Sequence, residues 1–387
     1  MLLNSTISVK RLLLIAYLLA VAITYLYAKS VTIVYGALEL LIAAVCYVEC
    51  LRQYPRIDRK LFLLCLCTLL LAWFSGLIHG DLKSTLLVTV PLIMPLYISI
   101  LNITYKDWKD FVPVTIAAIF IAFLMIERGI FGKINSNSLG FLAFMGVSLG
   151  ILLAQSVKFK LIAIAVVITG FLLSMNSGSR NVAIVGLICV ALLFVPKVVF
   201  RKRAVYIAIC VVVVGYSIFA EDIMAWAFSK PKIYDALTQF TDQYSDKAWE
   251  MAARVDFLKR VQRMITSRDL FIKLFGTGSL TTHGHNMFYQ CVLNFGYIGT
   301  VLIYAMFYRI FKVAFRLIKN RQDDLALGCV IILWGTFLLQ GADVFMIGPE
   351  AYAVVPQVVM GILLNRYAIY RREMIRLSHI ETQENTA

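Results

Sequence analysis

The chain has 387 residues, a net charge of +15 and a mean hydropathy of +0.82, with 61% hydrophobic and only 15% charged residues. This composition is far more apolar than a soluble domain needs, so it excludes a soluble protein and predicts an all-α integral membrane protein. The positive charge does not indicate nucleic acid as a partner, because the basic residues are distributed among turns between apolar segments.

Apolar segments recur along the whole chain. A bilayer core requires about 20 apolar residues per helix, and roughly twelve such segments can be recognised. Basic residues concentrate in every second turn, at 10–11, 52–60, 106–109, 158–160, 197–203, 309–321 and 366–376. Such turns stay in the cytoplasm. The expected organisation is helices one to nine in 1–220, an extracytoplasmic loop in 221–286, helices ten to twelve in 287–366 and a cytoplasmic tail in 367–387.

The first four segments are expected at about 12–28, 31–50, 61–78 and 84–101. Glu39 lies in the middle of the second, where a carboxylate is costly and therefore a functional candidate; a neutral acid bonded to Tyr35 or to another helix is the alternative. His79 and Asp81 form either a metal or proton site or a solvated outer turn. The eight cysteines lie in or beside apolar segments, which favours packing roles over disulfides or a metal site.

Two outer turns carry candidate polar residues. Segments five to nine are expected at about 111–126, 138–155, up to 174, 182–195 and 205–219. Asn135 and Asn137 precede the sixth helix, where asparagine is a suitable N-cap. Arg180 precedes the eighth helix, whose N-terminus favours an anion such as a diphosphate. The alternative for Arg180 is a side chain that reaches toward lipid phosphates.

A long polar loop, 221–284, separates the ninth and tenth segments. Apolar residues in it recur at helical spacing and predict an amphipathic helix, namely Met251, Val255, Leu258, Val261 and Ile265. Arg254 projects onto this apolar stripe, where an unpaired charge is prohibitive, so a phosphate is its expected partner. The alternative partner is a carboxylate such as Glu39 or Asp343. Off the stripe, Lys259, Arg260 and Arg263 are expected to meet solvent or lipid head groups.

Two of the four histidines, His283 and His285, stand at the start of the tenth segment. His285 is followed by Asn286 and then, after nine residues, by a Gly-x-x-Gly step at Gly296 and Gly299. Such glycines suit close helix packing in a membrane. The last three segments are expected at about 287–307, 325–339 and 350–365.

Arg180, Arg254 and His285 all fall on the outer side in this topology. Arginines bind a diphosphate through forked, charge-assisted hydrogen bonds and stabilise the charge that develops as it leaves. Histidine, which titrates near neutrality, can take the proton from an attacking sugar hydroxyl. The outer loops contain no acidic metal-binding motif, which favours a reaction without metal or cofactor.

The His-Asn pair at 285–286 and the Gly-x-x-Gly step at 296–299 resemble the histidine motif of the bacterial O-antigen ligase and polymerase family. The resemblance covers most of the chain: about twelve helices, cytoplasmic ends and a long, partly helical periplasmic loop between helices nine and ten. It implies a GT-C-type glycosyltransferase of the inner membrane with a periplasmic active site. It implies catalytic roles for His285, Arg254 and Arg180, and substrate binding by Arg180, Arg254, His283, Asn286 and Asn137.

The same resemblance implies an undecaprenyl-diphosphate-linked oligosaccharide as donor and an acceptor glycan or lipid A core as acceptor. Membrane lipids surround the protein, and a chain-length regulator is a further candidate partner. The stretches 178–181 and 274–286 favour a polymerase of O-antigen or capsule over a ligase of lipopolysaccharide biosynthesis, which is the alternative. A twelve-helix transporter is a third reading, for which the sequence shows no clear internal repeat.

Overall fold

The apolar runs of the sequence form the helices of the structure. The computed structural model describes residues 32–53, 57–80, 82–101, 136–155, 160–176, 180–228, 259–277, 286–321, 323–340 and 354–384. Its helices are α2 (Thr32–Arg52), α3 (Arg59–His79), α4 (Leu82–Ile100), α6 (Ser136–Ala154), α7 (Lys160–Asn176), α8 (Arg180–Leu193), the 3-10 helix η2 (Val199–Arg201), α9 (Arg203–Phe228), α12 (Leu270–Phe275), α13 (Met287–Arg321), α14 (Asp324–Gln340) and α15 (Val354–Glu384). Residues 259–267 are also helical. No strand occurs within these ranges, which confirms the all-α prediction for them.

Every expected segment that falls in the described ranges is a helix, while the first and fifth segments lie outside them. Three helices run past their predicted ends. α13 continues to Arg321 through the expected turn, because Ile310, Val313 and Leu317 recur at helical spacing among the basic residues and are buried. α15 likewise continues to Glu384. α9 bends at Phe219, its predicted end, and then continues to Phe228.

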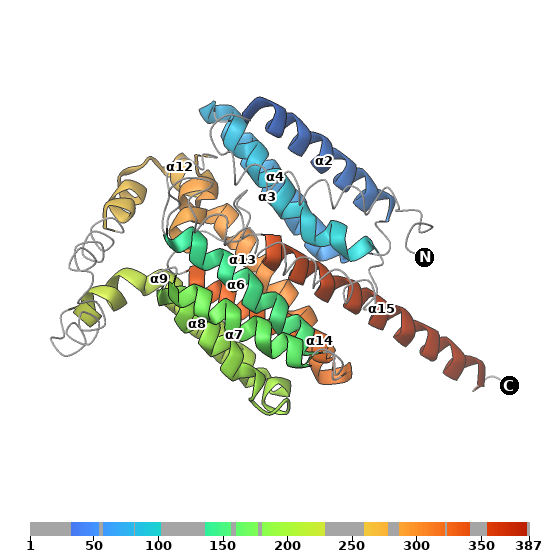
Figure 1. Ribbon diagram of the computed structural model, residues 1–387. Coiled ribbons are helices and arrows are strands. Elements are labelled where there is room, and N and C mark those ends of the chain that lie inside the picture. The colour runs from blue at the N-terminus through green and yellow to red at the C-terminus, as the bar shows by residue number, and fades with distance from the viewer. Residues whose placement is uncertain are drawn as a thin grey trace.

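The long helix α13 joins two groups of helices (Figure 1). On one side α3 packs against α13 and α4, and α4 also contacts α2 and α15. On the other side α6, α7 and α8 pack together, α8 packs against α14, and α14 contacts α13. α15 extends beyond the bundle toward the C-terminus (Figure 1). α13 therefore lies at the centre of the fold.

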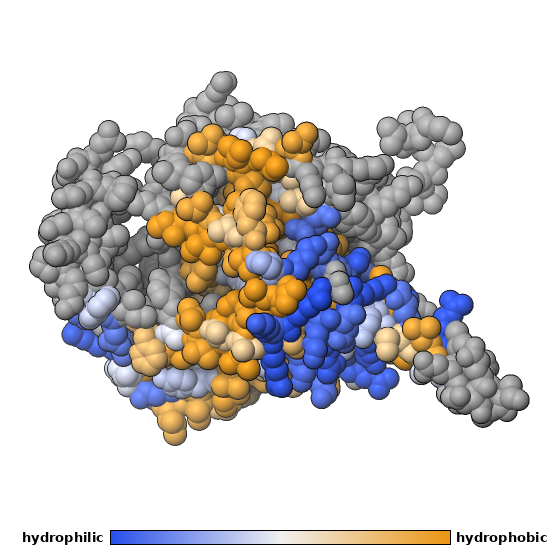
Figure 2. Space-filling view, turned by 90° about the horizontal axis from the view of Figure 1, so that it is seen from below, coloured by the Kyte–Doolittle hydropathy of each residue, from blue (hydrophilic) through white to orange (hydrophobic). Residues whose placement is uncertain are grey.

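Two helices, α3 and α13, are long and apolar enough to cross a membrane, judged by length and composition. Large hydrophobic side chains on several helices face outward, among them Leu70, Leu77, Leu161, Ile184, Val211 and Val301. Figure 2 shows hydrophobic and hydrophilic residues gathered in separate areas of one face. Extensive exposed apolar surface is compatible with a helical membrane protein. The number of crossings stays a prediction.

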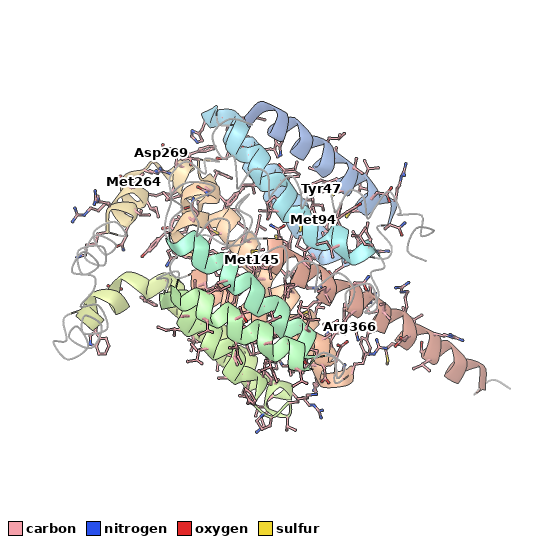
Figure 3. All side chains as sticks on the ribbon, viewed as in Figure 1. Tyr47, Met94, Met145, Met264, Asp269 and Arg366 are labelled. Atoms are coloured by element: carbon pink, nitrogen blue, oxygen red, sulfur yellow. The ribbon has the colours of Figure 1, made fainter. Side chains whose placement is uncertain are left out.

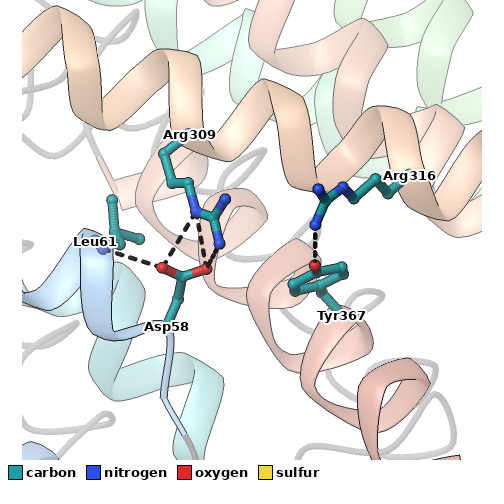
Figure 4. Close-up of polar contacts among 5 residues, drawn as sticks. All are labelled: Asp58, Leu61, Arg309, Arg316 and Tyr367. Carbon is teal, nitrogen blue, oxygen red and sulfur yellow. Dashed lines mark hydrogen bonds and ion pairs between the residues drawn. The ribbon is translucent and has the colours of Figure 1, made fainter. Parts of the chain in front are cut away.

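Ion pairs fasten the end of the bundle where α13 and α15 carry their arginines, which we call the clamp end. Arg309 donates through Nε and Nη2 to the Asp58 carboxylate, with a shortest distance of 2.6 Å (Figure 4). Asp58 also caps α3 by accepting the Leu61 N–H at 3.0 Å. Arg366 donates through Nε to the carboxylate of Asp323, which caps α14 by accepting the Ala326 N–H at 3.1 Å. Arg309 and Arg366, from two predicted cytoplasmic turns, thus pair with the aspartates that cap the N-termini of α3 and α14.

The Arg309–Asp58 pair gives a stability prediction. Asp58→Asn keeps an N-cap oxygen but leaves Arg309, whose side chain is only 18% exposed, without its counter-charge. The free energy of unfolding should fall by about 3 kcal/mol, as for other buried pairs that lose one partner. Thermal unfolding of the purified protein in detergent measures this.

The control is Lys197→Ala, because the Lys197–Asp324 pair is exposed on both sides, at 56% and 45%. Its loss should cost less than about 1 kcal/mol. Equal destabilisation by the two variants would contradict the clamp.

Candidate functional site

The segment with His283 and His285 is anchored at both ends on the first turns of α13. Residues 278–285, including both histidines, lie outside the described residues. Before them, the Thr277 N–H and hydroxyl both donate to the Leu293 carbonyl oxygen at 3.1 Å. After them, Asn286 is fully buried, and its side-chain oxygen accepts the Phe288 N–H at 2.8 Å. We call this end of the bundle the histidine end.

Two glycines allow the chain before the histidine segment to approach α13. Gly276 and Gly296 have φ of 75° and 65°, in the region that favours glycine. A Cβ at Gly276 would lie 2.3 Å from the Asn294 carbonyl oxygen, and one at Gly296 would lie 2.3 Å from the Leu274 backbone. The Ser75 hydroxyl of α3 donates to the Gly276 carbonyl at 2.7 Å. The two glycines thus allow the backbone around Gly276 to pack directly on the backbone around Gly296 in α13.

The expectation that both glycines of the Gly-x-x-Gly step pack helix against helix is half right. Gly299 faces α3, since a Cβ there would lie 2.7 Å from the Leu71 side chain. Gly296 instead interrupts the helical backbone of α13, with ψ of −174°, and receives the chain from α12. Its positive φ is a tertiary feature that no local pattern of the sequence reveals.

The segment after Arg254 docks beside the same turns of α13. Arg254 itself lies outside the described residues, but the helix at 259–267 begins five residues later. Its Val261 and Ile265 are buried against Tyr289, Val292 and Leu293 of α13. The predicted apolar stripe is confirmed for these two members. The predicted off-stripe residues Lys259, Arg260 and Arg263 are exposed.

Arg180 starts α8, and only its backbone is described. The opposite end of α8 lies at the clamp end, where Lys197 in the following turn bonds Asp324 at 2.6 Å. α8 therefore begins toward the histidine end (Figure 1). It packs against α14, α6 and α7. That the side chains of Arg180, Arg254 and His285 meet stays a prediction.

The side chains of two further candidates, Glu39 in α2 and Asn137 in α6, lie outside the described residues. Cys65 is buried and Cys67 exposed on α3, so the two thiols face different directions. Six of the eight cysteines are buried, as expected for packing residues. Within the described ranges no three His, Cys, Asp or Glu side chains are grouped to hold a metal ion.

Arg268 is a candidate that sequence reasoning did not single out. It lies between the helix at 259–267 and α12, next to Asp269 in the sequence. Figure 3 shows Asp269 and Met264 on the opposite side of the molecule from Arg366. The Nη1 of Arg268 is buried and has no hydrogen-bond partner among the described residues. Desolvation lowers the pKa of this guanidinium, against the opposing effect of Asp269. Such a group favours an anion.

Nothing in the sequence separates Arg268 from Arg260 and Arg263, since all three belong to the basic half of the loop. The difference is positional. Arg268 directly precedes Asp269, which caps α12 by accepting the Ile272 N–H at 2.8 Å. The helix break at this point turns the arginine inward, and only the fold reveals that.

A cavity of about 230 Å³, the outer pocket, lies beside the first turns of α13. Its polar lining comes from Asp222 of α9 and from Gln262 and Thr266 of the helix at 259–267. Aromatic side chains, including Tyr289 and Tyr297, and the aliphatic Ile218, Ile265 and Val292 line the rest. Carboxylate, amide and hydroxyl groups can hydrogen-bond sugar hydroxyls while rings cover the apolar face of a sugar. The outer pocket is therefore suited to a glycan.

Asn286 was predicted to bind substrate, and the structure gives it a position in the fold as the cap of α13. Asn286→Ala should lower the free energy of unfolding by about 1 kcal/mol, because the cap is lost. Asn286→Ser should restore most of that stability, since serine caps equally well. Thermal unfolding and glycan transfer are measured on both variants.

Activity separates the two roles of Asn286. Transfer restored by serine indicates that the residue acts through the cap. Stability restored while transfer stays lost indicates that the carboxamide contacts substrate.

Among protein-family models and curated proteins, none matches this chain.

Proposed function

We propose that the protein is a membrane glycosyltransferase similar to the O-antigen ligases and polymerases, with about twelve transmembrane helices, a GT-C architecture and a periplasmic active site in the inner membrane. It extends O-antigen or capsule by transferring an undecaprenyl-diphosphate-linked glycan to the next lipid-linked repeat unit. The exposed apolar surface supports a membrane location. The arginine clamps, at the end opposite the histidine segment, agree with a cytoplasmic clamp end.

One observation carries this proposal: the histidine segment and the chain after Arg254 are both held on the first turns of α13. Thr277 and Asn286 hold the former, and Val261 and Ile265 hold the latter. This arrangement supports the proposal that residues from separate parts of the sequence form one site. The outer pocket, with its polar and aromatic lining, lies there too.

The proposed reaction uses these groups as follows. Arg180 and Arg254 bind the donor diphosphate. His285 accepts the proton of an acceptor hydroxyl, whose oxygen forms the new bond to the anomeric carbon of the donor sugar. The bond from that carbon to the diphosphate oxygen breaks, and the electron pair leaves with the undecaprenyl diphosphate. The arginines stabilise its negative charge.

The polysaccharide profile of a deletion strain, analysed on a gel, tests this function. Lipid A core that carries a single repeat unit is the expected result, because the polymerase is lost. Bare core with glycan accumulating on the carrier lipid would indicate a ligase instead. Unchanged surface polysaccharide would contradict both activities and leave the transporter.

A further inference from the structure

A second cavity, of about 360 Å³, runs between α9 and α13 with α14 as its floor, and we call it the apolar groove. Val214 and Ile218 line it from α9, Phe288 and Phe311 from α13, and Trp334 from α14. Thr300, Tyr304 and Tyr308 carry the hydroxyls of α13 along the groove, and the Thr300 hydroxyl donates to the Gly296 carbonyl at 2.7 Å, but almost all the atoms that face the groove are apolar. The groove therefore offers an occupant almost no hydrogen-bonding group.

The groove is open along its side. Val301 and Tyr308 on its α13 edge are 68% and 61% exposed. Beyond the break at Gly296, the α13 lining from Thr300 to Phe311 covers eleven helical steps, about 16 Å at 1.5 Å each, and Phe288 continues the lining on the other side of the break toward the histidine end. An extended hydrocarbon chain could enter from the side and lie along it.

The apolar groove and the outer pocket are neighbours, because Ile218 and Phe288 line both. The Tyr289 hydroxyl donates to the Ile218 carbonyl at 3.4 Å and ties α13 to α9 at this junction. Phe288 is two residues from Asn286 and three from His285. The groove therefore runs from the histidine end toward the clamp end.

Resting on the proposed function, we infer that the apolar groove binds the polyprenyl chain of the lipid-linked donor while its sugar enters the outer pocket. The diphosphate, which separates the two parts, then falls at the junction beside the histidine segment. A phospholipid fits less well. It carries two acyl chains, whereas the groove is a single channel suited to one chain, and it has no glycan to place in the outer pocket lined by Asp222.

Cysteine labelling tests the occupant without requiring activity. Cys210 lines the groove on α9, and Cys67 on α3 is exposed elsewhere. The purified full-length protein in detergent is treated with N-ethylmaleimide, with and without undecaprenyl phosphate, and labelling of each cysteine is followed by mass spectrometry. At a lipid concentration of ~10 times Kd, labelling of Cys210 should slow roughly tenfold and that of Cys67 should not change.

Phosphatidylglycerol at the same concentration is the comparison probe. Equal protection of Cys210 by the two lipids would overturn the inference, because the groove would then bind any acyl chain. Protection by neither lipid would overturn it as well. Protection by undecaprenyl phosphate in a protein without glycan transfer would support the groove and count against the proposed function, so the two failures can be told apart.

A matched pair of variants gives a second measurement if Cys210 reacts too slowly. Val214→Trp fills the groove, whereas Val211→Trp, one helical turn earlier on α9, adds the same ring at a residue that is 64% exposed and outside the lining. Val214→Trp should weaken binding of undecaprenyl phosphate about tenfold, as overpacking does, and Val211→Trp should not. Equal binding by the two variants would overturn the inference.

Discussion

Replacement of His285 by alanine is expected to lower glycan transfer by ~10²–10⁴-fold, the range over which a positioned general base accelerates a reaction. The acceptor hydroxyl would then have no group to take its proton, while donor binding by the arginines would remain. The measurement is extension of an undecaprenyl-diphosphate-linked repeat unit by the purified variant, together with surface polysaccharide in cells. The amount of protein in the membrane should stay normal.

His79→Ala is the matched control, because His79 is an exposed histidine at the end of α3. It should retain full transfer. Arg254→Ala should lose transfer as His285→Ala does, and Arg263→Ala, exposed on the neighbouring helix, should not. Normal surface polysaccharide in both His285→Ala and Arg254→Ala would remove the catalytic assignment.

Gly276→Ala and Gly296→Ala are expected to displace the histidine segment and to abolish transfer, although neither residue touches substrate in the proposed reaction. Each new Cβ would lie 2.3 Å from backbone atoms of the segment packed against it, and each glycine has a positive φ. Backbone cannot move aside as a flexible side chain can, so we expect a loss of more than ~3 kcal/mol in the free energy of unfolding. Thermal unfolding and transfer are measured on the same preparations.

Gly186→Ala on α8 is the control for these variants, because a Cβ there meets nothing within 4 Å. It should be neutral or stabilising by up to ~1 kcal/mol, as alanine favours a helix more than glycine does. Glycan transfer that survives in both Gly276→Ala and Gly296→Ala would show that the close approach of these two backbone segments does not position the histidines.

The helices of the described part could be predicted from apolar runs because each run carries its own signal. The segment expected at 31–50 is α2, and the end expected at residue 219 coincides with the bend of α9. The continuation of α13 to Arg321 was missed, since basic residues lower the average hydropathy although the apolar positions keep helical spacing. Amphipathic helix ends need periodicity, not average hydropathy, to be found.

The site was less predictable because its contacts join distant parts of the chain. The motif around His285 and Asn286 predicted a site at the start of α13, but capping by Asn286 depends on where α13 begins. The contact of Gly276 with Gly296 has no local signature, and neither has the orphaned Nη1 of Arg268. The phosphate partner predicted for Arg254 stays a prediction, because Arg254 lies outside the described residues, whereas Val261 and Ile265 of its apolar stripe are buried as expected.

The two ends of the molecule differ in whether their arginines have a counter-charge. At the clamp end, Arg309 and Arg366 are neutralised by Asp58 and Asp323, so these cations build architecture and attract no anion. At the histidine end, the buried Nη1 of Arg268 has no such counterpart among the described residues. The ion-paired arginines thus hold helix ends in place, whereas the buried Nη1 of Arg268 is a candidate partner for an anion that approaches the histidine end.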